Sequence, residues 1–137
     1  MASRNLDLLH PTLRPIALKF IDACKAANIN MVICCTYRSD DEQNSLYAYG
    51  RTRAGKRVTN AKAGESAHNV VDKNGGGASC AFDIACFMGG KYAPDTDNQW
   101  ARAGKIGTDL GLDWLGSPDS TFFELAHFQL KDWRKYK

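Results

Sequence analysis

The chain of 137 residues lacks the features that mark membrane-spanning and exported proteins. No apolar run approaches the ~20 residues that a transmembrane helix requires. The first ten residues include Arg4 and Asp7 and contain no apolar core of a secretory signal peptide. We therefore expect a protein that is made in a cytoplasm and stays there unless another protein releases it. No internal repeat or low-complexity tract is present, so a single domain over residues 1–137, without a separate binding module, is predicted.

A strong excess of one charge is also missing, because 18 Lys and Arg residues face 15 Asp and Glu residues and give a formal net charge of +3. One segment favours a nucleic-acid-binding domain, a basic loop near Tyr47 and Tyr49 that contains Arg51, Arg53, Lys56, Arg57 and Lys62. The low net charge and the lack of a recognised motif argue against that class. We expect no nucleic-acid partner.

Cysteine occurs in an odd number, five, without a Cys-x-x-Cys pair. This excludes a thiolate zinc knuckle and a thioredoxin-like redox pair. Together with the missing export signal, it predicts free thiols. Cys34 and Cys35 lie in an apolar run and are predicted to be small buried hydrophobes. No cysteine lies in a sequence typical of cysteine hydrolases.

Histidine is scarce, with only His10, His68 and His127 in the chain. His10 precedes Pro11 at the approach to a predicted helix, where a surface or capping role is expected. A catalytic or metal-binding histidine must therefore be His68 or His127.

Three segments predict helices. Apolar residues at helical spacing run from Leu13 to Ala27, with Pro15 in the first turn. A capping box at residues 39–42 opens a second helix, which should end near Tyr49 before a glycine. A capping box at residues 96–99 opens a third helix, whose inner face is formed by Trp100, Ala103, Ile106, Gly107 and Leu110.

Strands are predicted at residues 30–37, 81–87 and 122–130, where β-forming and apolar residues concentrate. Residues 51–65 and 73–79 are predicted loops, and the second contains three consecutive glycines. The order of these elements predicts an α+β fold in which helices flank a small antiparallel sheet.

Two histidines and two carboxylates provide a candidate metal site: His68, Asp83, Glu124 and His127. Two histidines with one carboxylate form a standard catalytic zinc set, and a second carboxylate can act as general base. Residues 124 and 127 face opposite ways in a regular strand, so Glu124 must lie in the preceding loop or at a bulge to reach the same metal. The residues alone leave a second interpretation open, in which a core His127 lies beside a surface Glu124 and His68 lies in a solvated loop.

Several separated motifs occur in one order: Tyr37-Arg38-Ser39, Gln43, Leu46-Tyr47, Tyr49-Gly50-Arg51-Thr52, Gly55, Val58-Thr59, Gly64, Ser66 and His68-Asn69. Three more follow the pattern Ser-x-His, Ala-x-Asp and Asp/Glu-x-x-His, namely Ser66-Ala67-His68, Ala81-Phe82-Asp83 and Glu124-Leu125-Ala126-His127. Together they resemble the VanY-type zinc peptidases of the D-Ala-D-Ala carboxypeptidase clan, which have the hedgehog/DD-peptidase fold. Within that family, the resemblance is greatest to phage endolysins that are L-alanyl-D-glutamate peptidases. It extends from about residue 13 to residue 130.

The resemblance implies a role for each site residue. Zinc (Zn²⁺) would be held by His68, Asp83 and His127. Glu124 would be the catalytic acid/base, and Arg38 would bind a substrate carboxylate or polarise the scissile carbonyl. The alternative for Arg38 is a structural ion pair. Gln43 and Ser66 would hydrogen-bond the substrate or support the residues that do.

One spacing departs from the family pattern. Asp83 follows His68 by 15 residues, about eight more than the family usually has. The extra residues lie between Val70 and Cys80, and they raise Asp72 as a rival ligand. Asp83 is favoured because it alone has the Ala-x-Asp context, on a predicted strand. The added loop is expected to form a flap beside the cleft or to bind a further cation through Asp72.

The implied function is that of a phage endolysin that cuts the L-Ala-D-Glu bond of bacterial peptidoglycan stem peptides after release through a holin-type pore. A monomer is expected, with zinc in the site, although manganese or cobalt could substitute. The alternatives are a D-Ala-D-Ala carboxypeptidase and a non-catalytic zinc-containing wall-binding module. Trp114 could line the cleft. The basic C-terminal residues could contact an anionic envelope: Lys131, Arg134, Lys135 and Lys137.

Overall fold

The computed structural model describes residues 3–59, 61–117 and 124–137. Its helices are α1 (Arg14–Ala26), α2 (Asp40–Ala48) and α3 (Asn98–Asp109). Its strands are β1 (Met31–Cys35), β2 (Ala81–Met88), β3 (Lys91–Tyr92), β4 (Leu112–Trp114) and β5 (His127–Leu130). Short 3-10 helices are η1 (Leu6–Leu8), η2 (Ala67–Asn69) and η3 (Trp133–Tyr136).

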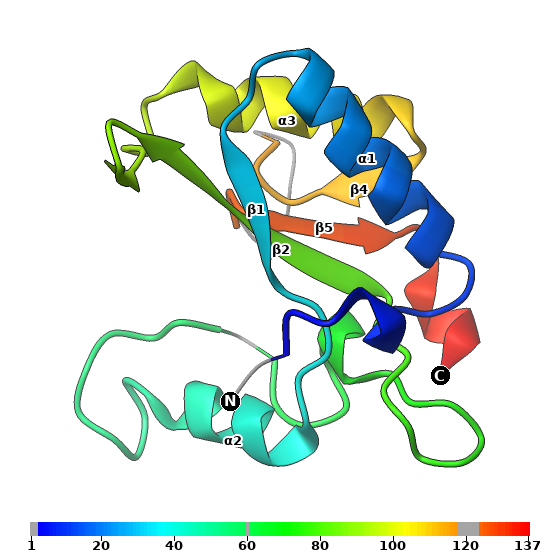
Figure 1. Ribbon diagram of the computed structural model, residues 1–137. Coiled ribbons are helices and arrows are strands. Elements are labelled where there is room, and N and C mark those ends of the chain that lie inside the picture. The colour runs from blue at the N-terminus through cyan, green and yellow to red at the C-terminus, as the bar shows by residue number, and fades with distance from the viewer. Residues whose placement is uncertain (1–2, 60, 118–123) are drawn as a thin grey trace.

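The strands form an antiparallel sheet in the order β1-β2-β5-β4, and β3 pairs with the far end of β2. Helices α1 and α3 lie together over one face of this sheet, and α2 lies apart with the long loop that follows it (Figure 1). The predicted α+β fold with a small antiparallel sheet flanked by helices is confirmed.

Aromatic rings fill the space between the sheet and the helices. Phe20 of α1 contacts Phe82 of β2 and Phe128 of β5, with ring centroids 5.2 and 4.9 Å apart. All three side chains are fully buried. Since neighbouring residues of a strand face opposite ways, Asp83 and His127, which follow and precede these two phenylalanines, lie on the face turned away from the helices. The core thus determines the face on which the polar site is built.

The predicted helices are confirmed, with one correction. The Ser39 hydroxyl caps α2 by accepting a hydrogen bond from the backbone N of Glu42 at 3.2 Å. The third helix begins one residue later than predicted, since its N-cap is Asp97 and not Thr96. The Asp97 carboxylate accepts a hydrogen bond from the backbone N of Gln99 at 3.3 Å, which a threonine at position 96 is not placed to do.

Two predicted strands are shorter than expected, since the one at 30–37 is limited to β1 (Met31–Cys35), and two short strands, β3 and β4, were not predicted. The predicted strand at 122–130 is shorter, because β5 begins at His127; residues 122 and 123 lie outside the described residues. The chain makes a turn before β5, in which the backbone N of His127 donates to the carbonyl of Glu124 at 3.2 Å. The short strand β4 at the sheet edge was not predicted, because three residues carry too little periodicity to be recognised.

The remaining predictions concern cysteines and membrane spans. All five cysteines fall in the described part of the chain and are free thiols. Cys35 is buried as expected, whereas Cys34 is only half-buried because it lies on the opposite face of the edge strand β1. Among the described residues, none of the helices has the length and apolar character needed to cross a bilayer.

Gly107→Ala is expected to destabilise the fold. A Cβ at this position of α3 would lie 2.5 Å from two ring carbons of the buried Phe128. The added methyl should cost about 1–3 kcal/mol in overpacking, partly offset by about 1 kcal/mol of helix propensity. Urea unfolding should show a lower midpoint, whereas Lys105→Ala on the exposed face of α3 should change it little. An unchanged midpoint for Gly107→Ala would contradict this packing account.

Candidate functional site

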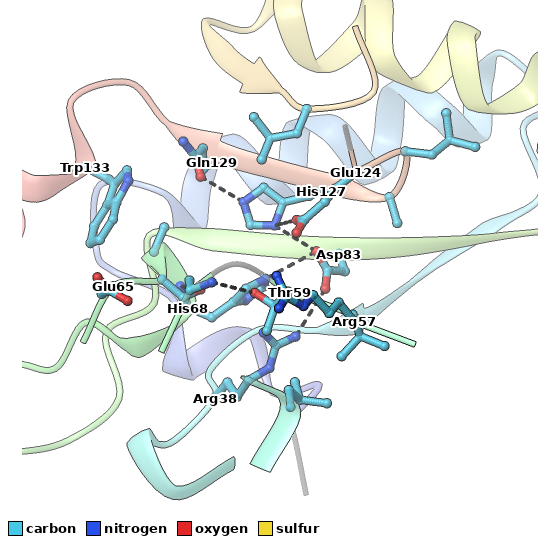
Figure 2. Close-up of a pocket in the computed structure, with 18 of the residues that line it drawn as sticks. Arg38, Arg57, Thr59, Glu65, His68, Asp83, Glu124, His127, Gln129 and Trp133 are labelled. Carbon is cyan, nitrogen blue, oxygen red and sulfur yellow. Dashed lines mark hydrogen bonds and ion pairs between the residues drawn. The ribbon is translucent and has the colours of Figure 1, made fainter. Parts of the chain in front are cut away.

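A cleft of ≈ 1270 Å³ opens on the face of the sheet away from α1 and α3 (Figure 2). Its lining includes residues of η2, β2, β5 and η3, residues 57–59 and 61, and the turn before β5. The polar side chains in the cleft include Arg38, His68, Asp83, Glu124 and His127. The structure thus gathers residues that are far apart in the sequence.

The short helix η2 fixes His68. Ser66 caps it, because the Ser66 hydroxyl accepts from the backbone N of His68 at 3.2 Å. The ring is 1% exposed, and its Nδ1 lies 2.7 Å from the carbonyl oxygen of Thr36. A carbonyl only accepts, so Nδ1 carries the hydrogen and donates. In the neutral ring Nε2 therefore presents its lone pair to Asp83 Oδ1, at 3.2 Å, and in the protonated ring it donates a hydrogen bond to that oxygen.

His127 meets the same oxygen from the neighbouring strand. Asp83 and His127 are directly paired across β2 and β5. His127 Nε2 lies 2.8 Å from Gln129 Oε1, which accepts its hydrogen. In the neutral ring Nδ1 therefore presents its lone pair 3.1 Å from Asp83 Oδ1, and in the protonated ring it donates a hydrogen bond to that oxygen. Each ring is thus oriented through the nitrogen that faces away from Asp83, as is usual for metal-binding histidines.

Two imidazole nitrogens and a carboxylate oxygen in one place favour a positive charge between them, as protons on the rings or as a bound cation. Burial alone would raise the pKa of Asp83, but the charges and hydrogen bonds of His68 and His127 outweigh it and lower that pKa well below its ordinary range. Burial would lower the pKa of His127, but Asp83 and Glu124 outweigh it and raise that pKa. A cation between these groups would satisfy all of them.

The donor set fits zinc. Ligand atoms bound to a tetrahedral zinc lie about 3.3 Å from one another, because each is about 2.0–2.1 Å from the metal. The two nitrogen–oxygen separations, 3.2 and 3.1 Å, agree with that value. Two imidazoles and one carboxylate also leave a coordination position for a reactant, as catalytic zinc sites require.

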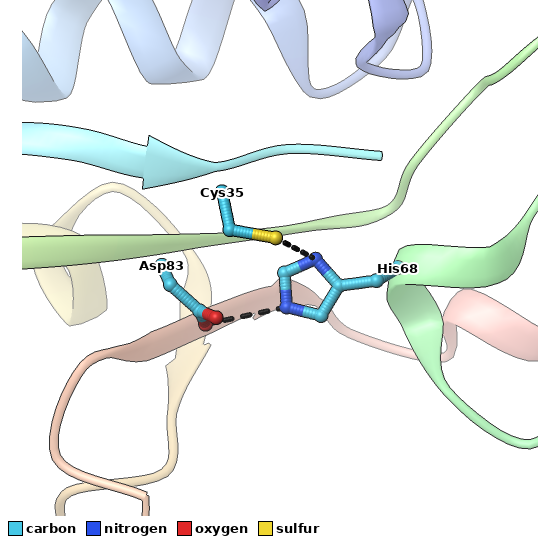
Figure 3. Close-up of side chains that lie close together, drawn as sticks. All are labelled: Cys35, His68 and Asp83. Carbon is cyan, nitrogen blue, oxygen red and sulfur yellow. Dashed lines mark hydrogen bonds and ion pairs between the residues drawn. The ribbon is translucent and has the colours of Figure 1, made fainter. Parts of the chain in front are cut away.

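Cys35 lies beside this group but on the other side of the His68 ring (Figure 3). Its Sγ is 3.8 Å from His68 Nδ1, the nitrogen already bonded to Thr36, whereas Asp83 lies at Nε2. Burial is the main cause that raises the pKa of the Cys35 thiol to about 12. A protonated thiol behind the ring is not placed to share a cation with Asp83, so His127 is the better third ligand.

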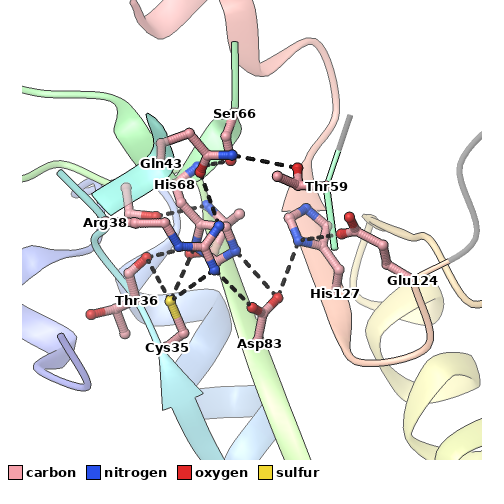
Figure 4. Close-up of polar contacts among 12 residues, drawn as sticks. Cys35, Thr36, Arg38, Gln43, Thr59, Ser66, His68, Asp83, Glu124 and His127 are labelled. Atoms are coloured by element: carbon pink, nitrogen blue, oxygen red, sulfur yellow. Dashed lines mark hydrogen bonds and ion pairs between the residues drawn. The ribbon is translucent and has the colours of Figure 1, made fainter. Parts of the chain in front are cut away.

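Arg38 and Gln43 form a linked pair beside His68 (Figure 4). Arg38 is 14% exposed; its NH2 lies 3.6 Å from Asp83 Oδ2, and its NH1 donates to Gln43 Oε1 at 3.0 Å. Gln43 is fully buried, and its Nε2 donates to the carbonyl of Ala61 at 2.5 Å. Gln43 thus ties Arg38 to the cleft wall and, with no exposed surface, is placed to support Arg38 and not to touch a substrate.

Glu124 lies in the turn before β5, the location that strand alternation requires if it is to reach the same point as His127. Its Oε2 is 3.4 Å from His127 Nδ1, and its side chain is 41% exposed toward the cleft. The carboxylate is therefore both close to the ligand group and accessible to water. Ser66 also lines the cleft while its oxygen caps η2.

Two predicted candidates lie elsewhere. The Asp72 carboxylate accepts from the backbone N of Asn74 and of Gly76, at 2.8 and 2.9 Å, and so closes its own glycine loop. None of the described residues 70–80 lines the cleft, contrary to the expected flap. Trp114 packs on Phe128 in the core and not in the cleft. The sequence analysis missed Arg57, Glu65 and Trp133 in the cleft wall, since no motif spacing marks them.

Comparisons with known proteins fit this site. Residues 7–74 match the family described as VanY: D-alanyl-D-alanine carboxypeptidase. The peptidoglycan L-alanyl-D-glutamate endopeptidase CwlK of Bacillus subtilis (strain 168) is 31% identical over 136 residues, covering 91% of this chain and 69% of CwlK. The chain belongs to the VanY-type peptidase family. The family predicted from the sequence motifs is thereby confirmed.

Solved structures show the same fold. The LdcB LD-carboxypeptidase superposes with a TM-score of 0.63 at 16% identity, covering 93% of this VanY-type chain. The chain spans 62% of LdcB, less than two thirds of its length. The L-Ala D-Glu endopeptidase ChiX of Serratia marcescens superposes with a TM-score of 0.59 at 18% identity, covering 97% of this chain and 92% of ChiX.

Gln43→Leu is expected to destabilise this VanY-type chain by about 1–3 kcal/mol, because the half-buried Ala61 carbonyl and Arg38 Nη1 would lose their partner. The free energy of unfolding from urea titration would measure the loss. Ser45→Ala, at an exposed position of the same helix, should stay within about 0.5 kcal/mol of the starting protein. Equal stability of both variants would show that the Gln43 amide does not hold the cleft wall.

Proposed function

We propose that this VanY-type peptidase is a zinc-dependent endopeptidase that hydrolyses the L-Ala-D-Glu bond of peptidoglycan stem peptides. The observation that carries the proposal is the convergence of two imidazole lone pairs on Asp83 Oδ1 in an open cleft, with a solvent-accessible Glu124 beside it. The names of CwlK and ChiX support the choice of bond, since both are described as cutting between L-alanine and D-glutamate.

We assign the zinc ligands to His68 Nε2, Asp83 and His127 Nδ1. When bound, zinc supplies a Lewis acid that lowers the pKa of water towards about 7. Glu124 then takes a proton from the attacking water and delivers it to the leaving amine. Its exposed carboxylate, 3.4 Å from His127 Nδ1, is close enough to the ligand group for both transfers.

Arg38 and Ser66 complete the assignment. The Arg38 guanidinium lies at the edge of the ligand group, 3.6 Å from Asp83 Oδ2, where it can polarise the scissile carbonyl. The Ser66 hydroxyl uses its oxygen to cap η2, so its hydrogen remains available to a substrate group in the cleft. Gln43 acts as a positioning residue for Arg38.

The second candidate is a D-Ala-D-Ala carboxypeptidase, which the description of the matching family favours. Both reactions use the same ligands and the same general base, so the products must distinguish them. Cleavage of the L-Ala-D-Glu bond creates new D-Glu amino termini, whereas the carboxypeptidase releases free D-alanine. Bound zinc without any cleavage would instead indicate a wall-binding module.

We further propose that the protein acts as a monomeric phage endolysin, released to the wall through a holin-type pore. The motif resemblance to phage L-alanyl-D-glutamate peptidases supports this proposal. A basic C-terminal surface would assist contact with an anionic envelope, because Lys131, Arg134, Lys135 and Lys137 are all exposed.

Glu124→Gln is expected to keep one zinc per chain and to lose activity by about 10²–10⁴-fold, the usual contribution of general acid–base catalysis. Asp83→Asn should lose the zinc as well as the activity, because it removes the charge that both imidazoles face. Mass spectrometry of peptidoglycan digests and metal analysis of the same samples would measure both effects.

Glu65→Gln provides the matched control, since it changes the same chemical group at the other end of the cleft (Figure 2). It should keep activity within about tenfold and its zinc unchanged. Full activity in Glu124→Gln would remove Glu124 from the mechanism, and zinc retained at full occupancy in Asp83→Asn would refute the ligand assignment.

A further inference from the structure

Three arginines line the cleft, and they differ in what their guanidinium groups contact. Arg38 is engaged by Gln43 and lies beside Asp83. Arg134 lies over the ring of Trp133, with its Cζ 4.7 Å from the ring centroid. Arg57 is exposed and makes no hydrogen bond or ion pair with any residue in the described part of the chain. Its guanidinium is therefore available to a ligand without a competing ring, ion pair or hydrogen bond among the described residues, whereas that of Arg134 is stacked on Trp133.

The backbone on both sides of Arg57 is fixed. Gly50, with φ +75°, lies so close that a Cβ there would be 2.7 Å from Arg57 Cγ and 2.8 Å from its backbone N. Two residues further on, the carbonyl of Thr59 accepts from Arg51 NH1 at 3.2 Å. The wall is fixed again at Ala61, whose carbonyl accepts from Gln43. Because the backbone around it is fixed, Arg57 loses less conformational entropy on binding a ligand than a side chain on a free loop would.

A guanidinium presents a planar pair of donors that matches a carboxylate. The proposed substrate carries such a group next to the bond that is cut. A glutamate within a peptide chain has two carboxyl groups, of which one continues the chain and the other is free. Arg57 lines the cleft beside Thr59 (Figure 2), where its guanidinium can meet a free carboxylate, whereas the carboxylates of Asp83 and Glu124 would repel the same group.

We propose that Arg57 is a specificity-determining residue that binds the free carboxylate of the substrate's D-glutamate. This inference rests on the proposed function and assigns different roles to two arginines. Arg38 serves the reacting carbonyl from its buried position, and Arg57 selects the charge of the residue that follows the scissile bond. The protein should therefore prefer a substrate with a free D-glutamate carboxylate over one in which that carboxylate is a carboxamide.

The test compares two soluble L-Ala-D-Glu-Lys peptides that differ only in this group, one with the carboxylate and one with the carboxamide. The zinc-loaded wild-type protein should cleave the carboxylate peptide with a kcat/KM about 10- to 100-fold higher, the range of a charge-assisted hydrogen bond. Arg57→Gln should bring the ratio close to one, mainly by slowing cleavage of the carboxylate peptide. Arg57→Lys should restore part of the ratio, since it keeps the charge and loses the paired donors.

Arg53→Gln is the matched control, because it removes the same charge from the same loop. Arg53 lies over the ring of Tyr49, with its Cζ 4.6 Å from the ring centroid, and it is not among the cleft-lining residues. The ratio of kcat/KM for the carboxylate peptide to kcat/KM for the carboxamide peptide should be the same in Arg53→Gln as in the wild type. An equal fall of this ratio in Arg53→Gln and Arg57→Gln would show that the overall charge of the basic loop, and not a contact of Arg57, sets the preference. That result would overturn the inference.

Other outcomes separate this inference from the function on which it rests. A wild-type ratio near one, or an unchanged ratio in Arg57→Gln while both peptides are still cleaved, would overturn the role of Arg57 and leave the endopeptidase assignment standing. Cleavage of neither peptide by the wild type would overturn both. Glutamine retains the Cγ that packs against Gly50, so circular dichroism of Arg57→Gln should match that of the wild type.

Discussion

The meeting of two imidazole rings at Asp83 Oδ1 is the interaction on which the rest of the site depends. It exists because β2 lies in the interior of the sheet, paired with β1 on one side and with β5 on the other. The register places Asp83 directly opposite His127 and beside Cys35. A shift of one residue would turn Asp83 into the phenylalanine core and carry Phe82 into the cleft. The aromatic core and the polar site therefore fix each other, each by occupying one face of the same strands.

The groups behind the two rings decide which nitrogens face the cleft. The carbonyl of Thr36 takes the hydrogen of His68 Nδ1, and Gln129 Oε1 takes that of His127 Nε2. Without these acceptors, either ring could turn a hydrogen toward Asp83 and satisfy it as an ordinary buried hydrogen bond. With them, each neutral ring has only a lone pair to offer toward Asp83, and a positive charge, as protons on the rings or as a bound cation, satisfies all three groups. The arrangement is thus more informative than the mere proximity of two histidines and an aspartate.

Much of the site could be predicted because its chemistry leaves few candidates. With only three histidines, the candidates for a metal-binding histidine were His68 and His127. Strand alternation required Glu124 to lie in the entering loop or at a bulge, and it lies in the turn before β5. The motifs left two roles open for Gln43, contact with the substrate or support of Arg38, and only the fold separates them, because burial and partner choice follow from how α2 meets the segment near Ala61. Arg57 was one basic residue among several in a loop, and only the folded backbone separates it from Arg53. The strand β4 and the one-residue shift to Asp97 were missed because local signals of this length are ambiguous to within a residue or two.

The long spacing between His68 and Asp83 has a simple physical explanation. The added residues form a side loop closed at its base, where the backbone N of Ala78 donates to the carbonyl of Val70 at 2.9 Å. Below that base, the backbone N of Cys80 donates to the carbonyl of Ala67 at 2.9 Å, which joins η2 directly to the start of β2. The two ligands are thus positioned by contacts that bypass the loop, and its length costs only the slowly growing entropy of closure. Asp72 is committed to closing that loop, so the insertion lengthens the sequence between the ligands without moving either of them.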